Sequence, residues 1–137
     1  MRVTTRAEAH RGPIEAVGAE CWIGDPDRLG TLRGALEGVT VACWLLGSAT
    51  GPEEQLRALH GARLRAFAGH VVDTTVRGLL YEAAGSCVSA EALAEGERIV
   101  TATARENAIP LAILRADPAD VPQWLTQARA ALAALLG

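Results

Sequence analysis

A chain of 137 residues, of which 50% are hydrophobic and 21% charged, has the length and apolar content of one folded domain, and long disorder is excluded. The net charge of −3 and the absence of any basic run argue against a protein that binds nucleic acid. No apolar run approaches the about 20 residues of a membrane-spanning helix, and three cysteines without Cys-x-x-Cys spacing fit a reducing cytosol. We therefore expect a cytoplasmic protein without a membrane segment.

Strand-like and helix-like segments alternate along the chain. Apolar runs predict strands over residues 2–5, 20–23, 39–46, 76–81 and 109–114. Helical spacing and capping residues predict helices over residues 8–17, 25–37, 53–68, 89–107 and 118–136. Five strands that alternate with helices predict an α/β fold with a parallel sheet and right-handed crossovers.

The cysteine and histidine positions indicate packing rather than metal chemistry. Cys21 and Cys43 fall in apolar strand-like runs, where a cysteine is usually a small core residue. His60 and His70 do not share a helix face, and His10 belongs to another element. A metal site needs three or four converging ligands, so we expect none.

The strand ends define where a ligand would bind. In parallel sheets, ligands lie beyond the carboxyl ends of the strands. The predicted strands place Arg6, Asp25, residues 47–49, Tyr81, Glu82 and Arg115 at that rim. We therefore expect a binding site there.

Four segments in and around this rim carry a resemblance to a known family. They are Trp22-Ile23-Gly24-Asp25-Pro26-Asp27, Ala35-Leu36-Glu37-Gly38-Val39, Leu45-Leu46-Gly47-Ser48-Ala49 and Ile109-Pro110-Leu111-Ala112-Ile113-Leu114-Arg115. In their order and spacing they resemble the atypical and extended short-chain dehydrogenases, which include NAD-dependent epimerase/dehydratase-like and NmrA-like proteins. The resemblance implies a Rossmann-like fold that binds NAD or NADP.

The resemblance also implies roles for five residues. Arg6 matches the position that closes the second family strand, where a guanidinium can meet the 2′-phosphate of NADP; the alternative is a solvated arginine at a strand end. Asp25 matches the family aspartate near the adenine, or else caps a helix. Gly47, Ser48 and Ala49 match the turn under the cofactor ribose, or else form a tight turn between strand and helix.

Two parts of the family pattern are missing. No Gly-x-Gly-x-x-Gly or Gly-x-x-Gly-x-x-Gly occurs, so the opening strand, phosphate-binding loop and first helix have no counterpart. The chain has no lysine, which excludes the Tyr-x-x-x-Lys pair, and we expect the only tyrosine, Tyr81, to be a packing residue.

We therefore expect residues 1–137 to form one Rossmann-like domain without its first strand–helix unit, either truncated or with a misassigned start. Cofactor binding is expected to be weak or lost, and catalysis absent. The strands that flank the missing unit either pair directly or leave an open position, and exposed strand edges favour self-association. The alternative interpretation is a complete flavodoxin-like module of five strands, which binds a partner without catalysis.

Overall fold

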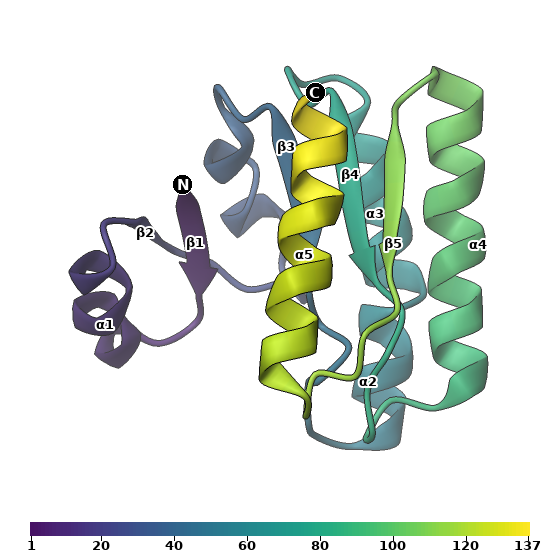
Figure 1. Ribbon diagram of the computed structural model, residues 1–137, viewed down its shortest axis with the longest axis horizontal. Helices are drawn as coiled ribbons and strands as arrows, with labels where there is room; N and C mark the ends of the chain where they lie inside the picture. The colour runs from purple at the N-terminus through teal and green to yellow at the C-terminus, as the bar shows by residue number, and fades with distance from the viewer.

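Five parallel strands in two sheets form the frame of the protein, in a computed structural model that describes residues 1–137 (Figure 1). The strands are β1 (Arg2–Thr5), β2 (Glu20–Ile23), β3 (Val41–Trp44), β4 (Gly78–Glu82) and β5 (Leu111–Leu114). The helices are α1 (Arg11–Ala16), α2 (Glu53–Leu59), α3 (Ala62–Val71), α4 (Ala90–Asn107) and α5 (Val121–Leu136), with short 3₁₀ turns at Glu8–His10, Leu29–Thr31 and Gly34–Leu36. The predicted α/β class and the alternation of parallel strands with helices are confirmed.

The strands divide between two sheets. β1 pairs with β2, with Val3 opposite the half-buried Cys21, and β3, β4 and β5 form the second sheet in that order. No ladder joins β1 to β3, so the direct pairing of these strands, one of the two expected arrangements, does not form. The continuous five-stranded sheet that the flavodoxin-like alternative requires does not form either.

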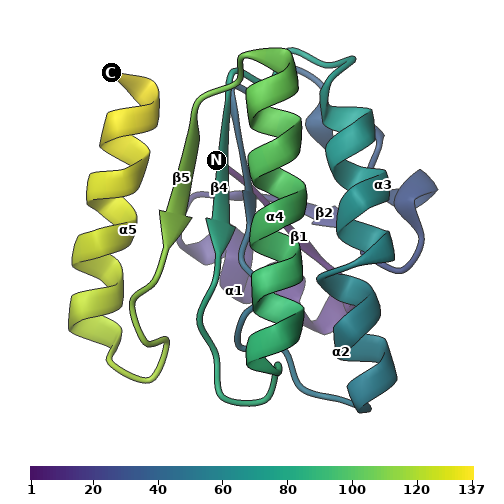
Figure 2. The same cartoon turned by 90° about the vertical axis from the view of Figure 1, so that its right-hand side faces the viewer.

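Helices cover both faces of the three-stranded sheet. Figure 2 shows α5 on one face and α2, α3 and α4 on the other. β4 is the central strand and is buried along its full length because both of its faces are covered. Ser89 caps α4 as predicted, its hydroxyl oxygen accepting from the Ala92 N–H at 3.1 Å. None of the helices combines the length and hydropathy that crossing a bilayer requires.

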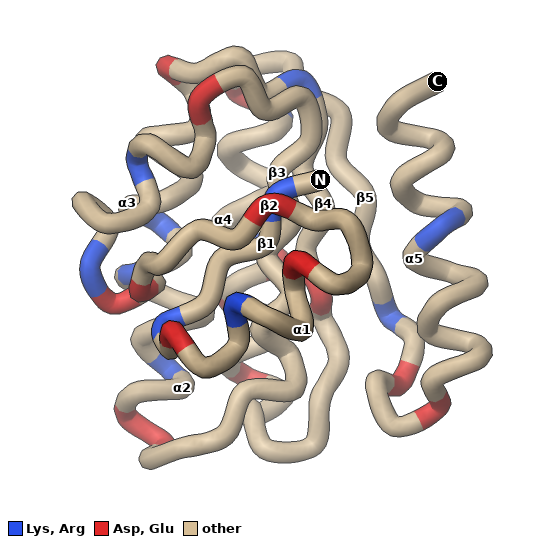
Figure 3. The backbone as a smooth tube through the Cα atoms, turned by 90° about the vertical axis from the view of Figure 1, so that its left-hand side faces the viewer, with Lys and Arg blue, Asp and Glu red and all other residues tan.

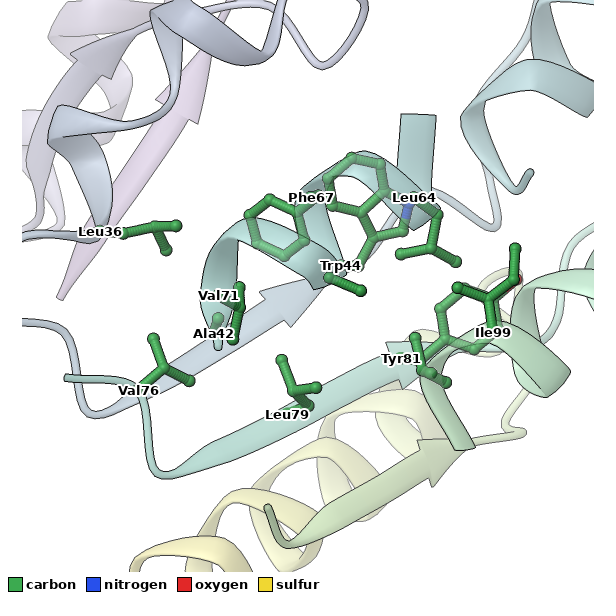
Figure 4. Packing of buried hydrophobic residues seen from close by; sticks show 12 residues of the cluster. Leu36, Ala42, Trp44, Leu64, Phe67, Val71, Val76, Leu79, Tyr81 and Ile99 are labelled. Carbon is green, nitrogen blue, oxygen red and sulfur yellow. The ribbon is translucent and has the colours of Figure 1, made fainter. Parts of the chain in front are cut away.

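The main core lies between the larger sheet and the helices α3 and α4 (Figure 4). Trp44 from β3 packs on Phe67 from α3, with the two ring centroids 4.7 Å apart. Tyr81 from β4 is fully buried, which confirms its expected role in packing. The other buried members of this cluster are aliphatic: Leu36, Ala42, Leu64, Ala68, Val71, Val76, Leu79, Ile99 and Val100.

Arg2 ties the smaller sheet to the chain that leads into β3. Its Nη1 atom donates to the carbonyl oxygens of Ala35 at 2.6 Å and Glu37 at 3.1 Å. Its Nε atom pairs with Glu20 at 2.9 Å, and its guanidinium lies 5.8 Å from the ring centroid of Trp22. One cation at the start of β1 thus satisfies two loop carbonyls, which stabilises the connection between the two sheets.

The predicted helix over residues 25–37 is wrong, because this segment forms two 3₁₀ turns and irregular chain instead. Gly30 and Gly34 lower its helix propensity. Trp22 packs so closely on Gly34 that a Cβ atom there would lie 2.7 Å from the indole Cη2 atom. Asp25 accordingly does not cap a helix but accepts, through Oδ1, the N–H two residues later at 2.9 Å.

The predicted helix over residues 53–68 is divided into α2 and α3. The break falls at His60 and at Gly61, whose φ of −123° and ψ of −103° are not helical. The His60 side chain is fully buried, and its Nε2 atom lies 3.0 Å from the carbonyl oxygen of Leu46. We attribute the break to this tertiary contact, because the apolar spacing itself continues through it.

Cys43 does not belong to the core, contrary to the expectation from its apolar strand. Its side chain is exposed, whereas the neighbouring Ala42 and Trp44 are buried on the other face of β3. The apolar cluster beneath α5 contains Leu80 of β4 and Leu114 of β5 but no residue of β3. α5 therefore packs mainly on β4 and β5 and covers this face of β3 only in part.

Candidate functional site

A cavity of about 310 Å³ opens at the carboxyl ends of the larger sheet. It lies where the turn after β3, the end of β4 and the first turn of α5 meet. Its lining is half apolar and includes one carboxylate and one hydroxyl: Leu45, Ser48, Glu82, Pro118, Val121 and Trp124. Concave sites of this composition at strand ends are the usual ligand sites of α/β proteins.

Glu82 is the buried charge of this cavity, with an exposed fraction of 2%. Its Oε1 atom accepts the backbone N–H of Gly47 at 2.8 Å, and its Oε2 atom accepts the indole N–H of Trp124 at 2.7 Å. Both oxygens are thus hydrogen-bonded, as a buried carboxylate requires. The side chain connects the turn after β3 to α5 and fixes the two walls of the cavity.

The turn after β3 is shaped by contacts within the protein. A Cβ atom on Gly47 would overlap the carbonyl oxygen of Ala84, so the position accepts only glycine. Ser48 is exposed and lines the cavity, whereas Ala49 packs against the apolar cluster between α2 and α4. The Gly47 N–H is occupied by Glu82, and Ser48 is the residue of this turn that lines the cavity.

A second buried network stands behind this turn. His60 Nε2 donates to the Leu46 carbonyl oxygen at 3.0 Å, and His60 Nδ1 accepts the hydroxyl of Tyr81 at 2.6 Å. Burial lowers the pKa of His60, and the hydrogen bond to Leu46 and the charge of Glu82 oppose this shift only in part. Burial, together with the charges of Glu97 and Glu82, raises the pKa of Tyr81. Both side chains are therefore neutral near pH 7 and act as structural links.

Arg6 and Asp25 lie on the smaller sheet. Arg6 follows β1 with its side chain exposed, and none of the eight ion pairs of the protein involves it. Asp25 follows β2 and turns its carboxylate to its own loop. Asp27 holds that loop to the larger unit, because its carboxylate accepts from Gln55 Nε2 and Arg63 Nε, each at 3.3 Å.

The predicted site residues therefore form two groups, and each group lies at the carboxyl ends of one of the two sheets. Residues 47–49 border the cavity of the larger sheet, and Arg6 and Asp25 stand at the ends of β1 and β2. The sequence placed Glu82 at the rim but gave it no role, and Trp124 was not expected there. A charged residue that ends the apolar run of β4 was the available signal for Glu82, whereas Trp124 carried none. No group of three His, Cys, Asp or Glu side chains converges on a metal position.

Comparison with known proteins identifies the fold. No family model and no curated protein matches the sequence. Triphenylmethane reductase from Citrobacter sp. superposes with a TM-score of 0.63 at 20% identity, over 83% of this chain and 38% of the reductase. Its complex with NADP(H) gives the same TM-score and identity, over 83% and 39% of the two chains. The protein gox2253 superposes with a TM-score of 0.60 at 21% identity, over 82% and 42%.

The chain thus spans about two fifths of the length of the solved structures that it matches. It shares a Rossmann-like fold with these proteins, and the fold that the sequence resemblance implied is confirmed.

Proposed function

We propose that this chain binds an NADP-type dinucleotide weakly at the carboxyl-terminal rim of its strands, without catalysing a reaction on it. The fold shared with a reductase whose crystal structure is an NADP(H) complex is the observation that carries the proposal. The position of the cavity at the ends of parallel strands supports it, because this is where α/β sheets bind their ligands.

Each group of rim residues has a role in the proposal. Arg6 is exposed and free of ion pairs, so its guanidinium is available to a 2′-phosphate. Asp25 lies beside the adenine, and residues 47–49 pass under the ribose, with the Ser48 hydroxyl facing the ligand. A preference for NADP over NAD then depends on Arg6 alone.

The proposed weak affinity and the proposed absence of catalysis both follow from the groups that the rim presents to a ligand. The described chain offers no glycine-rich loop to a diphosphate, and the Gly47 N–H that such a ligand could use is bonded to Glu82. Tyr81, the only tyrosine, is fully buried against His60 and cannot reach a ligand in the cavity. An acid–base step would therefore need a group that the rim does not present.

The proposal is tested by titrating the protein with NADPH while following tryptophan fluorescence. We expect saturable binding in the micromolar range, about tenfold weaker binding for Arg6→Ala, and similarly weak binding of NADH to the unmodified chain. Arg105→Ala is the matched control, because Arg105 is an exposed arginine in the last turn of α4, away from the rim. Absence of saturation, or equal effects of the two arginine substitutions, would overturn the proposal.

A further inference from the structure

Glu82 holds a buried negative charge that no cation of the chain balances. Its side chain is 2% exposed, and its two oxygens accept only the neutral N–H groups of Gly47 and Trp124. None of the eight ion pairs of the protein includes it. His60 is neutral near pH 7, because burial lowers its pKa. Buried carboxylates are usually paired with a cation, since desolvating an unpaired charge is costly, and Glu82 lacks that partner.

The elements around the cavity do not supply the missing cation. Arg115 follows β5 directly, but its guanidinium pairs with Glu97 of α4. The positive end of the α5 dipole is met by the Asp120 carboxylate, which accepts the Gln123 N–H at 3.3 Å. Figure 3 shows the tube of α5 almost entirely without charge, and its one charged residue, Arg129, lies about two turns along the helix. The charge of Glu82 is therefore left to whatever enters the cavity.

The cavity gives a ligand a path to this carboxylate. Glu82 lines the space of about 310 Å³ and is otherwise enclosed, so a donor that reaches it comes through the cavity. A carboxylate offers about four acceptor positions, and the protein fills two of them. The walls are apolar and aromatic: Leu45 is 37% exposed, Val121 is 57% exposed, and Trp124 contributes an indole. The lining thus combines one negative charge with a surface for an apolar body.

We propose that this cavity binds a small organic cation, a primary ammonium group on a compact aromatic or aliphatic body. The ammonium donates to the unfilled acceptor positions of Glu82, and the body packs against Leu45, Val121 and the indole of Trp124. The volume lies at the small end of ligand cavities, which suits a body of one ring. The proposal does not depend on dinucleotide binding, and the titrations that test it contain no dinucleotide.

Benzylamine, which is an ammonium ion at pH 7, is the probe, and a ¹⁵N NMR titration of the unmodified protein is the measurement. The signals to follow are the Trp124 indole N–H and the Gly47 amide, because both groups donate to Glu82. We expect saturable shifts of both with a Kd below about 1 mM. Benzyl alcohol and benzoate carry the same ring with a neutral and an anionic head group, and we expect each to bind at least about tenfold more weakly.

Val121→Arg tests the same site without removing a hydrogen bond of Glu82. Residue 121 lines the cavity and is more than half exposed, so an arginine there keeps the fold and brings a competing cation to the cavity. We expect it to weaken benzylamine binding at least about tenfold. Leu125→Arg is the matched control, because Leu125 is also exposed on α5 but does not line the cavity. Salt screens its charge, and we expect less than about a threefold change.

Four outcomes would overturn the proposal. They are equal affinities for benzylamine and benzyl alcohol, tighter binding of benzoate than of benzylamine, absence of saturation, and equal effects of the two arginine substitutions. None of them bears on the NADPH titration, so failure of the cation site and failure of dinucleotide binding are told apart.

Discussion

Gly47 and Gly85 lie in direct backbone contact at the ends of β3 and β4. A Cβ atom on Gly85 would overlap the carbonyl oxygen of Gly47. We expect Gly85→Ala to lower the free energy of unfolding by about 1–3 kcal/mol, the usual cost of overpacking. Urea unfolding measures the change. Gly69→Ala in α3 is the control, because a Cβ atom there meets nothing within 4 Å and alanine favours the helix. Equal unfolding midpoints for Gly85→Ala and Gly69→Ala would show that Gly85 does not lie against Gly47.

Tyr81→Phe tests the hydrogen bond that joins β4 to the break between α2 and α3. The Tyr81 hydroxyl donates to His60 Nδ1 at 2.6 Å, and both side chains are fully buried. Removing the hydroxyl leaves the imidazole acceptor without a partner, which costs about 1–3 kcal/mol of unfolding free energy. Urea unfolding measures the loss, and the ¹⁵N shift of His60 Nδ1 reports the lost donor. An unchanged shift would show that this hydrogen bond is absent in solution.

The buried imidazole of His60 also predicts how stability depends on pH. Burial lowers the pKa of His60, so the unfolded chain, with its ordinary histidine pKa of about 6.5, binds a proton that the folded protein does not. The free energy of unfolding is therefore complete above about pH 7 and falls as the pH drops through about 6.5 toward 5. The loss stops only below the lowered pKa of the folded state.

Urea unfolding between pH 5 and pH 8 measures how the free energy of unfolding depends on pH. Two variants show which part of this slope comes from His60. His60→Gln is expected to be less stable at every pH, but to lose the part of the slope that His60 contributes. His70→Gln in the last turn of α3, where the side chain is partly exposed, is expected to keep it. Identical slopes in all three proteins would mean that His60 accepts a proton in the folded state as readily as in the unfolded chain.

Much of the fold was predictable because it depends on short-range patterns. The apolar runs of β3 and β4 and the Ser89 cap of α4 are properties of neighbouring residues, and the structure confirms each of them. The parallel arrangement followed from the alternation of strands and helices. The tight turn at Gly47 was predicted as well, and its cause is the approach of the turn after β4.

The errors fall where distant residues decide the local structure. The helix break at His60 depends on Leu46 and Tyr81, which come from β3 and β4. The irregular segment over residues 25–37 depends on Trp22 packing against Gly34. Helix propensity and apolar spacing carry no information on such partners, and tertiary contacts override them.

Glu82→Gln tests the connection between the two walls of the cavity. Glu82 accepts from the N–H groups of Gly47 and Trp124, which lie 35 and 42 residues away in sequence. A glutamine amide accepts through one atom only, so its NH₂ group would face one of the two donors. We expect a loss of about 1–3 kcal/mol in the free energy of unfolding and a shift of tryptophan fluorescence from Trp124. Glu97→Gln is the control, because Glu97 pairs with Arg115 at the surface and its loss costs about 0–1 kcal/mol. Equal losses in the two variants would show that Glu82 does not hold the turn after β3 against α5.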